Sequence, residues 1–430
     1  MSEAENSAEL MVSARWIEAL DRQATIIMAI FARAGFEPIA PPVIQPADVF
    51  LDLIGEDLRQ RTYVFYDPDG AELCLRPDLT IPACRLYLAR HAPVASPVGL
   101  AESEPAFGRT GQPKGKEKPQ PKGHQEQPAR FAYNDVVFRY QPTRGSLVRP
   151  REFRQVGIES FAASDPAKAE AEILALSVES VRAAGLRAFR LHIGDLGLFT
   201  ALIAAMAMPE RWRARLKHHF WRPEAFRRQL GHVVNPGEMH RELPVLMLGA
   251  ITASAPEDAE RLVETYIAER GLTIAGTRGT DEIAEQLQSH GQDLLAQPLP
   301  EASAALIEAY LKIECAAEAA PARIRALLAG TGIGIEPALA AYDNRLRLAA
   351  AESIDISQAL FSAGFGRAFE YYTGFVFELV SPVLGDATPL GGGGRYDTLV
   401  GAISGGRDVP AVGAALHTER LLLAVRGGRP

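Results

Sequence analysis

Two segments decide the fold of this chain: RFAYNDVVFRY at residues 130–140 and REFRQVGIESF at residues 151–161. In both, apolar and polar side chains alternate, as they do in a β-strand with one buried face. The stretch between them contains arginine and proline, and proline is typical of a connecting loop. We therefore predict that the two segments form a β-hairpin.

The second strand of this hairpin would carry a row of polar side chains on one face. Because successive side chains on a strand point to opposite faces, Arg151, Gln155 and Glu159 would project together. Phe153 would stand between them, and Gly157 would leave space. Such a row needs a ligand or water, but a solvent-exposed sheet face carries as many charges. Taken alone, the row favours the exposed face.

The elements around the hairpin are predicted from helical spacing, from proline and from turn residues. Before it we expect a helix at 13–34, the extended proline-rich segment Phe36–Ile44, a short helix at 47–53, a hairpin of 62–65 with 72–75, and a helix at 79–91. After it we expect a helix at 165–184, a strand at 188–193, helices over 196–350, a strand at 368–380, and a strand running into a helix over 410–423.

Strands thus bracket a helical block, which indicates an α+β fold with mainly antiparallel pairing. We expect a core domain made of residues 1–195 and 351–430, with a helical insertion or subdomain over 196–350.

The segment 103–130 is rich in proline and lysine and has almost nothing to bury. This composition is typical of a mobile loop. Its charge suggests RNA binding, but no aromatic residue for stacking on bases is interleaved among its lysines. We therefore expect a solvated insertion.

Composition restricts the class of protein. The 430 residues are 47% hydrophobic and 23% charged, which is typical of a globular chain of roughly two to three domains. Cys74, Cys84 and Cys315 are far apart, so neither a disulfide framework nor a zinc site is expected. The acidic N-terminus and the lack of a long apolar run disfavour secretion and membrane spanning, which leaves the cytosol. The net charge of -8 opposes bulk attraction to nucleic acid.

Two further segments could bind a small ligand. In Leu75–Thr80 a carboxylate and a hydroxyl stand where a strand meets a helix, so Asp78 and Thr80 could hold an ammonium group. Asp78 could equally serve only as a helix cap. The run Gly391–Gly394 lacks the spacing of a phosphate-binding loop, and either lets the backbone approach a ligand or forms a flexible turn.

Taken in order, these segments resemble the catalytic core of class II histidyl-tRNA synthetases over most of the chain. The matching segments are Phe36–Pro42 for motif 1, Phe138–Arg139 with Arg151–Glu159 for motif 2, Pro410–Leu421 for motif 3, Leu75–Thr80 for the segment that binds the histidine amino group, and Gly366–Thr373 with Gly392–Asp397 for the histidine-specific signatures. The resemblance implies an antiparallel sheet flanked by helices, and a dimer interface formed by the motif 1 proline segment.

The chain departs from the synthetase pattern where that pattern handles ATP and tRNA. Arg139-Tyr140-Gln141 replaces the Arg-x-Glu that contacts ATP, which removes the carboxylate. His417 replaces a motif 3 glycine, and an imidazole there would intrude on the nucleotide. The sequence ends shortly after Arg420, without room for an anticodon-binding domain.

These departures match a paralogous family, the regulatory subunits of ATP phosphoribosyltransferase. That resemblance implies a cytoplasmic, non-catalytic homodimer inside a hetero-oligomer, which activates a short catalytic subunit in the first step of histidine biosynthesis and senses histidine for feedback inhibition. It implies no catalytic residue, metal, cofactor, membrane or nucleic-acid partner. The histidine pocket implied by resemblance consists of Asp78, Thr80, Gln155, Glu159, Arg367, Tyr371 and Tyr372, with Arg139 and Arg420 as a vestigial nucleotide site.

Two other functions stay open. The first is an enzyme that makes an aminoacyl-adenylate for an acceptor other than tRNA, which the retention of Arg139, Arg367 and Arg420 favours. The second is a nucleic-acid-binding module that uses the segment 103–130, against which the acidic net charge argues.

Overall fold

The computed structural model describes residues 14–51, 53, 56–91, 127–141, 149–236, 245–271, 279–366 and 371–429. Two sequence predictions therefore lie outside the described residues: most of the lysine-rich loop, 103–126, and the pocket residue Arg367. The chain divides into a larger unit of residues 1–199, 313–325 and 336–430 and a smaller one of 200–312 and 326–335. None of the described helices has the length and apolar composition needed to cross a membrane.

In the described part of the larger unit, a sheet of nine strands has the order β1-β5-β6-β12-β11-β10-β7-β9-β8. Its strands are β1 (Glu37–Pro38), β5 (Ala129–Phe138), β6 (Glu152–Phe161), β7 (Arg190–Asp195), β8 (Glu314–Ala316), β9 (Leu360–Ser362), β10 (Phe375–Val380), β11 (Gly391–Arg395) and β12 (Ala411–His417). Neighbours are antiparallel except for the pairs β1–β5 and β7–β9. The mainly antiparallel α+β sheet predicted from the sequence is confirmed.

The hairpin predicted over 130–140 and 151–161 is β5 with β6. Its register places Tyr133 opposite Gly157 and Phe131 opposite Glu159. On its other side β6 pairs with β12, where Glu159 lies opposite Gly413. Both neighbours of β6 are strands, so β6 is an inner strand of the sheet.

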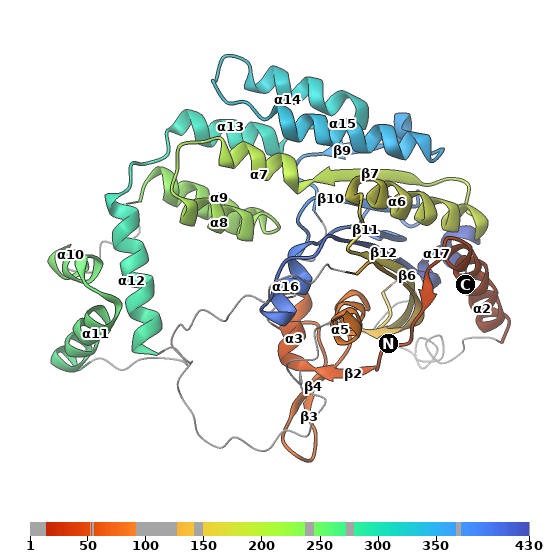
Figure 1. The fold of residues 1–430 in the computed structure, drawn as a ribbon, viewed down its shortest axis with the longest axis horizontal. Coiled ribbons are helices and arrows are strands. Elements are labelled where there is room, and N and C mark those ends of the chain that lie inside the picture. Colours follow the sequence, from red (N-terminus) through yellow and green to blue (C-terminus); the bar gives the residue numbers. More distant parts are fainter. Residues whose placement is uncertain are drawn as a thin grey trace, which may run out of the picture. The chain divides into compact units, whose positions relative to one another are not determined.

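Helices cover both faces of this sheet (Figure 1). The helices of the larger unit are α2 (Ala14–Arg33), α3 (Ala47–Leu51), α4 (Glu56–Arg59), α5 (Thr80–His91), α6 (Pro166–Ala183), α15 (Glu336–Ala351), α16 (Thr398–Ser404) and α17 (Thr418–Val425), with 3₁₀ turns at Ala317–Ala319 and Ile356–Gln358. Helix α6 packs on β10, β11 and β12, and both α2 and α15 pack on α6. Helix α5 packs against β6 and α16.

Local sequence signals explain where these helices begin and end. Asp165 caps α6 by accepting a hydrogen bond from the Lys168 N–H at 3.2 Å, and Pro166 occupies the first turn, where no donor is needed. Helix α2 ends before Gly35, whose φ of 83° is the left-handed conformation that favours glycine.

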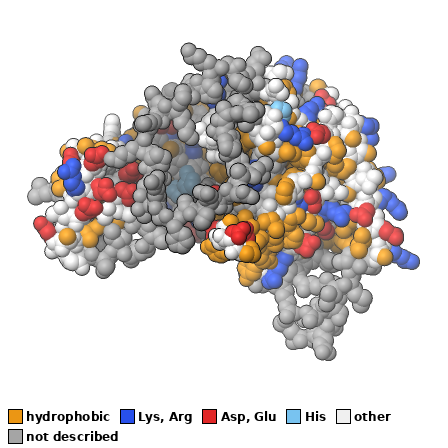
Figure 2. All heavy atoms as spheres, turned by 60° about the horizontal axis from the view of Figure 1, so that its bottom comes forward, with side chains coloured by type: hydrophobic (Ala, Val, Ile, Leu, Met, Phe, Trp, Pro, Cys, Tyr) orange, Lys and Arg blue, Asp and Glu red, His pale blue; other side chains and the backbone are white. Residues whose placement is uncertain are grey.

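A second, small sheet has the order β2-β4-β3, with β2 (Ile44–Pro46), β3 (Val64–Tyr66) and β4 (Glu72–Leu75). It contains the predicted hairpin, whose turn places Gly70 at a φ of 84°. Ile44, Val64 and Tyr66 are exposed, Tyr66 by 69%. Hydrophobic side chains gather on the side of the molecule where this sheet lies (Figure 2). The register places Ile44 on one face of the small sheet and places Val64 and Tyr66 on the other, so the sheet exposes apolar side chains on both faces.

Of the two interpretations of the glycine run at 391–394, the flexible turn is wrong, whereas Gly392 does line a cavity. The run forms β11, between β10 and β12. A Cβ on Gly393 would lie 2.0 Å from the Gly413 carbonyl oxygen, and one on Gly391 would lie 2.3 Å from the Ala415 carbonyl oxygen. Glycine is needed here because the neighbouring strand leaves no room for side chains.

The smaller unit is helical where it is described. Its helices are α8 (Glu210–His219), α9 (Pro223–Val234), α10 (Val245–Ala253), α11 (Pro256–Arg270), α12 (Thr280–Leu295) and α13 (Glu301–Leu311), while α7 (Leu196–Ala204) and α14 (Ala320–Leu328) continue from one unit into the other.

A buried carboxylate organises the smaller unit. Asp293 is fully buried and accepts hydrogen bonds from Arg211 Nε at 2.5 Å and Trp212 Nε1 at 2.6 Å, as well as from Arg215. His232 Nε2 lies 3.2 Å from Asp293 Oδ2, the oxygen that Arg215 also contacts. Burial raises the pKa of Asp293, but these donors outweigh burial and hold the pKa below its usual value.

The insertion that we predicted over 196–350 is wider than this compact unit. Strand β8 pairs with β9 in the large sheet, and α15 packs on α6. Residues 313–325 and 336–351 therefore pack within the larger unit, because partners distant in sequence recruit them.

Candidate functional site

A polar cavity of about 330 Å³, including the part open to solvent, lies beside α5 on one face of the large sheet. Its lining residues are Asp78, Thr80, Gln155, Tyr371, Tyr372, Gly392, Tyr396, Gly413, Ala414 and Ala415. Five residues of the predicted histidine pocket are among them, and Glu159 contacts the wall through Thr80. The structure thus brings together six predicted residues from three separate parts of the chain.

Glu159 is held by hydroxyl groups. Its Oε1 accepts hydrogen bonds from Thr80 Oγ1 at 2.7 Å and from the Tyr133 hydroxyl at 2.9 Å, and its Oε2 accepts one from the Tyr396 hydroxyl. Burial raises the pKa of Glu159 to about 7, although these donors act in the opposite direction. The Glu159 carboxylate is therefore poorly hydrated, which favours the binding of a proton or of a cationic ligand.

Asp78 combines the two roles that the sequence left open. Its Oδ1 accepts a hydrogen bond from the Ile81 N–H at 3.3 Å, in the first turn of α5, and its Oδ2 lies 3.5 Å from the Tyr371 hydroxyl. Burial raises the pKa of Asp78 to about 6, and the positive charge of Arg139 opposes this rise. Asp78 therefore caps the helix and also lines the cavity.

Gln155 contributes an acceptor to the cavity. Its side chain is 5% exposed, and within the described residues its amide oxygen has no hydrogen-bond donor. A buried acceptor without a donor costs free energy unless a ligand or water supplies one. This part of the cavity is therefore suited to a ligand that donates hydrogen bonds.

The row predicted on β6 is only partly correct. Gln155 and Glu159 are buried between strands, so the interpretation of an exposed sheet face is wrong. Arg151 precedes the strand, donates a hydrogen bond to the Gln141 carbonyl at 3.2 Å and lies over the Tyr140 ring. Arg151 therefore does not share the cavity face, because the strand alternation begins only after it.

Tyr133 and Tyr396 are site residues that the sequence analysis did not assign. Gly157 faces Tyr133 across the hairpin, and a Cβ on Gly157 would lie 2.6 Å from the Tyr133 ring. A glycine opposite a tyrosine in the register of β5 and β6 is the signal that could have found Tyr133. Tyr396 lies inside a segment already matched to a family motif, but no role was assigned to it.

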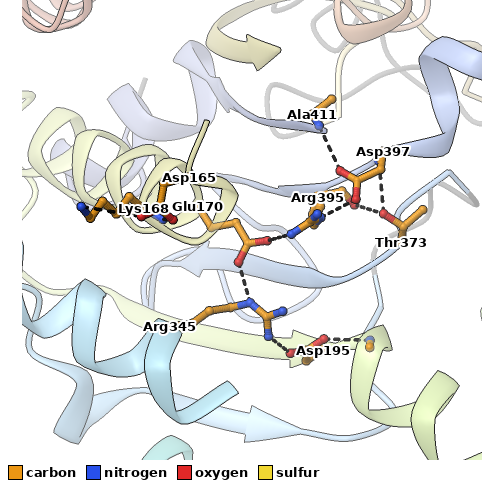
Figure 3. A network of polar contacts seen from close by, with 10 residues as sticks. Asp165, Lys168, Glu170, Asp195, Arg345, Thr373, Arg395, Asp397 and Ala411 are labelled. Atoms are coloured by element: carbon orange, nitrogen blue, oxygen red, sulfur yellow. Dashed lines mark hydrogen bonds and ion pairs between the residues drawn. The ribbon is translucent and has the colours of Figure 1, made fainter. Parts of the chain in front are cut away.

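The segment that carries Tyr396 is fixed by polar contacts that its neighbours Arg395 and Asp397 make (Figure 3). Arg395 Nη1 donates to Glu170 on α6 at 3.1 Å, and Arg395 Nε donates to Asp397 at 2.5 Å. The Asp397 N–H in turn donates to Thr373 Oγ1 at 3.2 Å. These bonds join the segments that follow Tyr372 and Tyr396, so they hold two cavity tyrosines in place.

The same network extends to α15. Arg345 pairs with Glu170 at 2.5 Å and also with Asp195 at the end of β7 (Figure 3). Burial raises the pKa values of Glu170 and Asp195, while the two arginines act in the opposite direction. The network therefore connects α6, α15, β7 and β11 behind the cavity.

The residues assigned to a vestigial nucleotide site, Arg139 and Arg420, donate hydrogen bonds to different backbone carbonyls. Arg139 Nε donates to the Pro77 carbonyl at 2.8 Å, and its guanidinium lies 5.1 Å from the centre of the Phe153 ring. Arg420 instead donates to the Pro389 carbonyl at 2.9 Å. The ring of His417 stacks on Phe153 with centroids 4.6 Å apart, so one face of this ring is already covered.

Comparison with known proteins places the chain in one family. The family model for histidyl-tRNA synthetase matches residues 12–104, 120–249 and 260–421. A protein from Brucella anthropi named ATP phosphoribosyltransferase regulatory subunit is 30% identical over 90% of this chain and 93% of its own length. One of the same name from Rhizobium meliloti is 34% identical over 94% of this chain and 96% of its own length.

Solved structures show the same fold. The chain matches a Bacillus halodurans C structure described as an ATP phosphoribosyltransferase regulatory subunit/histidyl-tRNA synthetase with a TM-score of 0.60 and 20% identity, over 96% of this chain and 81% of that one. It also matches a histidine–tRNA ligase subunit from Alicyclobacillus acidocaldarius with a TM-score of 0.53 and 20% identity, over 97% and 95% of the two chains. From its fold, its family model and these relatives, the chain belongs to the family of ATP phosphoribosyltransferase regulatory subunits, which is built on the class II histidyl-tRNA synthetase fold.

Proposed function

We propose that this chain is a cytoplasmic, non-catalytic regulatory subunit that activates a short ATP phosphoribosyltransferase in the first step of histidine biosynthesis. The names of its relatives support the regulatory role. His417 stacked on Phe153, together with Gln141 in place of a glutamate, argues against adenylation by this chain.

The observation that carries the proposal is the cluster of oxygen acceptors at the cavity: Asp78, Gln155 and Glu159. We propose that free histidine is the ligand. Its ammonium group needs an anionic contact, for which Asp78 and Glu159 are suited. In this proposal Arg367 and the amide N–H group of Gln155 bind the carboxylate, and the amide oxygen of Gln155 accepts from the ammonium group. Tyr371 and Tyr372 offer rings and hydroxyls to the imidazole.

Calorimetric titration of histidine into the wild type and Glu159→Gln tests the pocket. A charge-assisted contact contributes about 1.5–3 kcal/mol, so the variant should bind histidine roughly ten- to a hundredfold more weakly. Glu152→Gln, at the exposed start of the same strand, is the control and should bind as the wild type does. Unchanged affinity in Glu159→Gln would remove Glu159 from the pocket.

The regulatory role is tested on the complex reconstituted with a short catalytic subunit. Histidine should inhibit the complex that contains the wild type, and it should inhibit the complex with Glu159→Gln only at correspondingly higher concentration, because the two sites are thermodynamically linked. Inhibition that persists unchanged after histidine binding is lost would show that the sensor lies elsewhere.

We also propose that the chain forms a two-fold symmetric homodimer through the proline segment Phe36–Ile44 and the adjoining small sheet. The exposed Ile44, which shares a face of the small sheet with Leu73 and Leu75, supplies an apolar side chain of the kind that protein interfaces bury. Light scattering should show a dimer at micromolar concentration. Ile44→Asp should shift it to monomer, whereas Val383→Asp, at an equally exposed site, should not. A wild-type monomer would contradict this proposal.

A further inference from the structure

Arg76 is among the largest fully buried side chains in the described structure, with 0% of its surface exposed. Arginine is almost never fully buried unless it is paired. Arg76 stands two residues before Asp78, in the segment that leads from β4 to the cavity and α5.

The guanidinium of Arg76 joins three places in the larger unit. Its Nε donates to the Val136 carbonyl at 2.8 Å, its Nη1 donates to the Pro41 carbonyl, and its Nη2 pairs with Asp135 Oδ1 at 2.7 Å. Asp135 and Val136 belong to β5, and Pro41 belongs to the proline segment Phe36–Ile44. One side chain therefore ties the proline segment to the sheet.

The backbone of Arg76 repeats this connection. Its N–H donates to the Val43 carbonyl at 3.1 Å, and its carbonyl accepts a hydrogen bond from the Phe138 N–H at 3.0 Å. The next residue, Pro77, accepts the hydrogen bond from Arg139. The chain thus enters the Asp78–Thr80 loop from a point that is fixed on two sides.

A buried ion pair is an expensive way to gain stability, since an apolar side chain of similar size often does as well. The planar guanidinium supplies two directed hydrogen bonds, to Pro41 and Val136, and an ion pair with Asp135, and these contacts fix the proline segment relative to β5. The carboxylate of Asp78 then has a defined place at the cavity.

We infer that Arg76 is a positioning residue for the ligand cavity: it fixes the Asp78–Thr80 loop to the proline segment, so that order in the one and ligand binding at the other are coupled. This inference deepens the proposed function, because it rests on ligand binding at Asp78 and on the proline segment as the dimer surface. Histidine should then lower the dissociation constant of the dimer, and dimerisation should lower the dissociation constant for histidine by the same factor.

The test uses Asp135→Asn in the full-length chain. Asp135 is 30% exposed, so its replacement weakens the anchor of Arg76 without leaving a hole in the core. We expect histidine affinity to fall roughly tenfold, and the effect of histidine on dimer dissociation to shrink. Hydrogen exchange in the ligand-free protein should become faster in the segments 41–46 and 77–81. Arg76→Lys keeps the positive charge but loses the planar guanidinium with its several N–H donors, so it should show the same changes as Asp135→Asn.

Two controls separate positioning from general stabilisation. Glu37→Gln removes an exposed ion pair between the proline segment and Arg90 of α5, and should leave hydrogen exchange in the segments 41–46 and 77–81 unchanged. Asp135→Glu restores the charge and should recover part of the affinity. If Asp135→Asn lowers only the melting temperature, and leaves local exchange, histidine affinity and the histidine-dependent dimer shift as in the wild type, Arg76 has only a structural role.

The two proposals fail in different ways. If the wild type binds no histidine, the proposed ligand is wrong, and the exchange measurement alone decides on Arg76. Faster exchange confined to 41–46 and 77–81 in Asp135→Asn, but not in Glu37→Gln, supports the positioning role. Equal exchange in both variants overturns it.

Discussion

Gly413 determines how closely β12 can approach Glu159. A Cβ at this position would lie 1.5 Å from Glu159 Oε2 and 2.7 Å from the Ile158 carbonyl oxygen. Neither the buried carboxylate nor the backbone of β6 can move far, because Glu159 is already bonded on both oxygens. Glycine at 413 is therefore a requirement of the cavity.

We predict that Gly413→Ala displaces Glu159 and weakens histidine binding roughly tenfold or more, with a loss of about 1–3 kcal/mol in stability from overpacking. Calorimetry and urea unfolding measure the two effects. Gly231→Ala is the matched control, because nothing lies within 4 Å of its added Cβ. Wild-type affinity in Gly413→Ala would show that the position of Glu159 does not matter for the ligand.

The ionised Glu159 side chain should lower the free energy of unfolding at neutral pH, although it contributes to histidine binding. Its folded-state pKa of about 7 exceeds its ordinary value of 4.5, so the folded protein holds this proton more tightly than the unfolded chain does. Tight protonation of Glu159 therefore stabilises the folded protein fully below about pH 4.5, and this stabilisation is lost as the pH rises through about pH 7. The free energy of unfolding should fall by about 3 kcal/mol over this range. The raised pKa of Asp78 acts in the same direction.

Glu159→Gln, which mimics the protonated acid, should therefore be more stable than the wild type at about pH 8 and similar to it at about pH 5. Urea unfolding at the two pH values measures this difference. The same variant should have lost histidine affinity, so stability and binding should change in opposite directions. A variant that is less stable at both pH values would contradict the raised pKa.

At the scale of elements, the network behind the cavity connects four of them through Glu170. This carboxylate on α6 lies between Arg345 on α15 and Arg395 on β11, and it is buried. Helices and strands distant in sequence are thus held in register by one acidic side chain, and the tyrosines beside Arg395 depend on that register.

We predict that Glu170→Ala lowers the free energy of unfolding by about 3 kcal/mol, because the partly buried Arg345 and Arg395 lose the carboxylate oxygens that they share. Glu179→Ala on the same helix is the control: its pair with Arg33 is exposed, so the change should stay within about 1 kcal/mol. Denaturant titration of the two variants measures the difference. Equal effects would mean that the network adds little beyond a surface pair.

At the scale of the whole molecule, we predict that the chain alone gives no histidine-dependent exchange between ATP and pyrophosphate above a mock preparation. His417 covers one face of Phe153, and Gln141 lacks a carboxylate. A histidyl-tRNA synthetase assayed in parallel is the positive control. Robust exchange by the purified chain would favour instead an enzyme that makes an aminoacyl-adenylate for an acceptor other than tRNA.

Much of the fold could be predicted because its signals are local. The alternation in β5 and β6, the turn at Asp67–Gly70 and the helix that ends before Gly35 each depend on a few consecutive residues. Five residues of the predicted pocket line the cavity and a sixth contacts its wall, because the ordered motifs resembled a known family. The role of these residues as histidine ligands stays a prediction.

The remainder was decided by contacts between distant segments. The glycine run could not be recognised as a strand, because what requires glycine there is the backbone of β12. Tyr133 and Tyr396 meet at Glu159 only when β5, β6 and β11 are assembled, and Arg345 reaches Glu170 across a long separation in sequence. The sequence by itself thus determined the elements and the family, since these depend on local pattern and ordered motifs. Only the tertiary structure decided which buried charges share one environment, because burial and dielectric surroundings are properties of the assembled core.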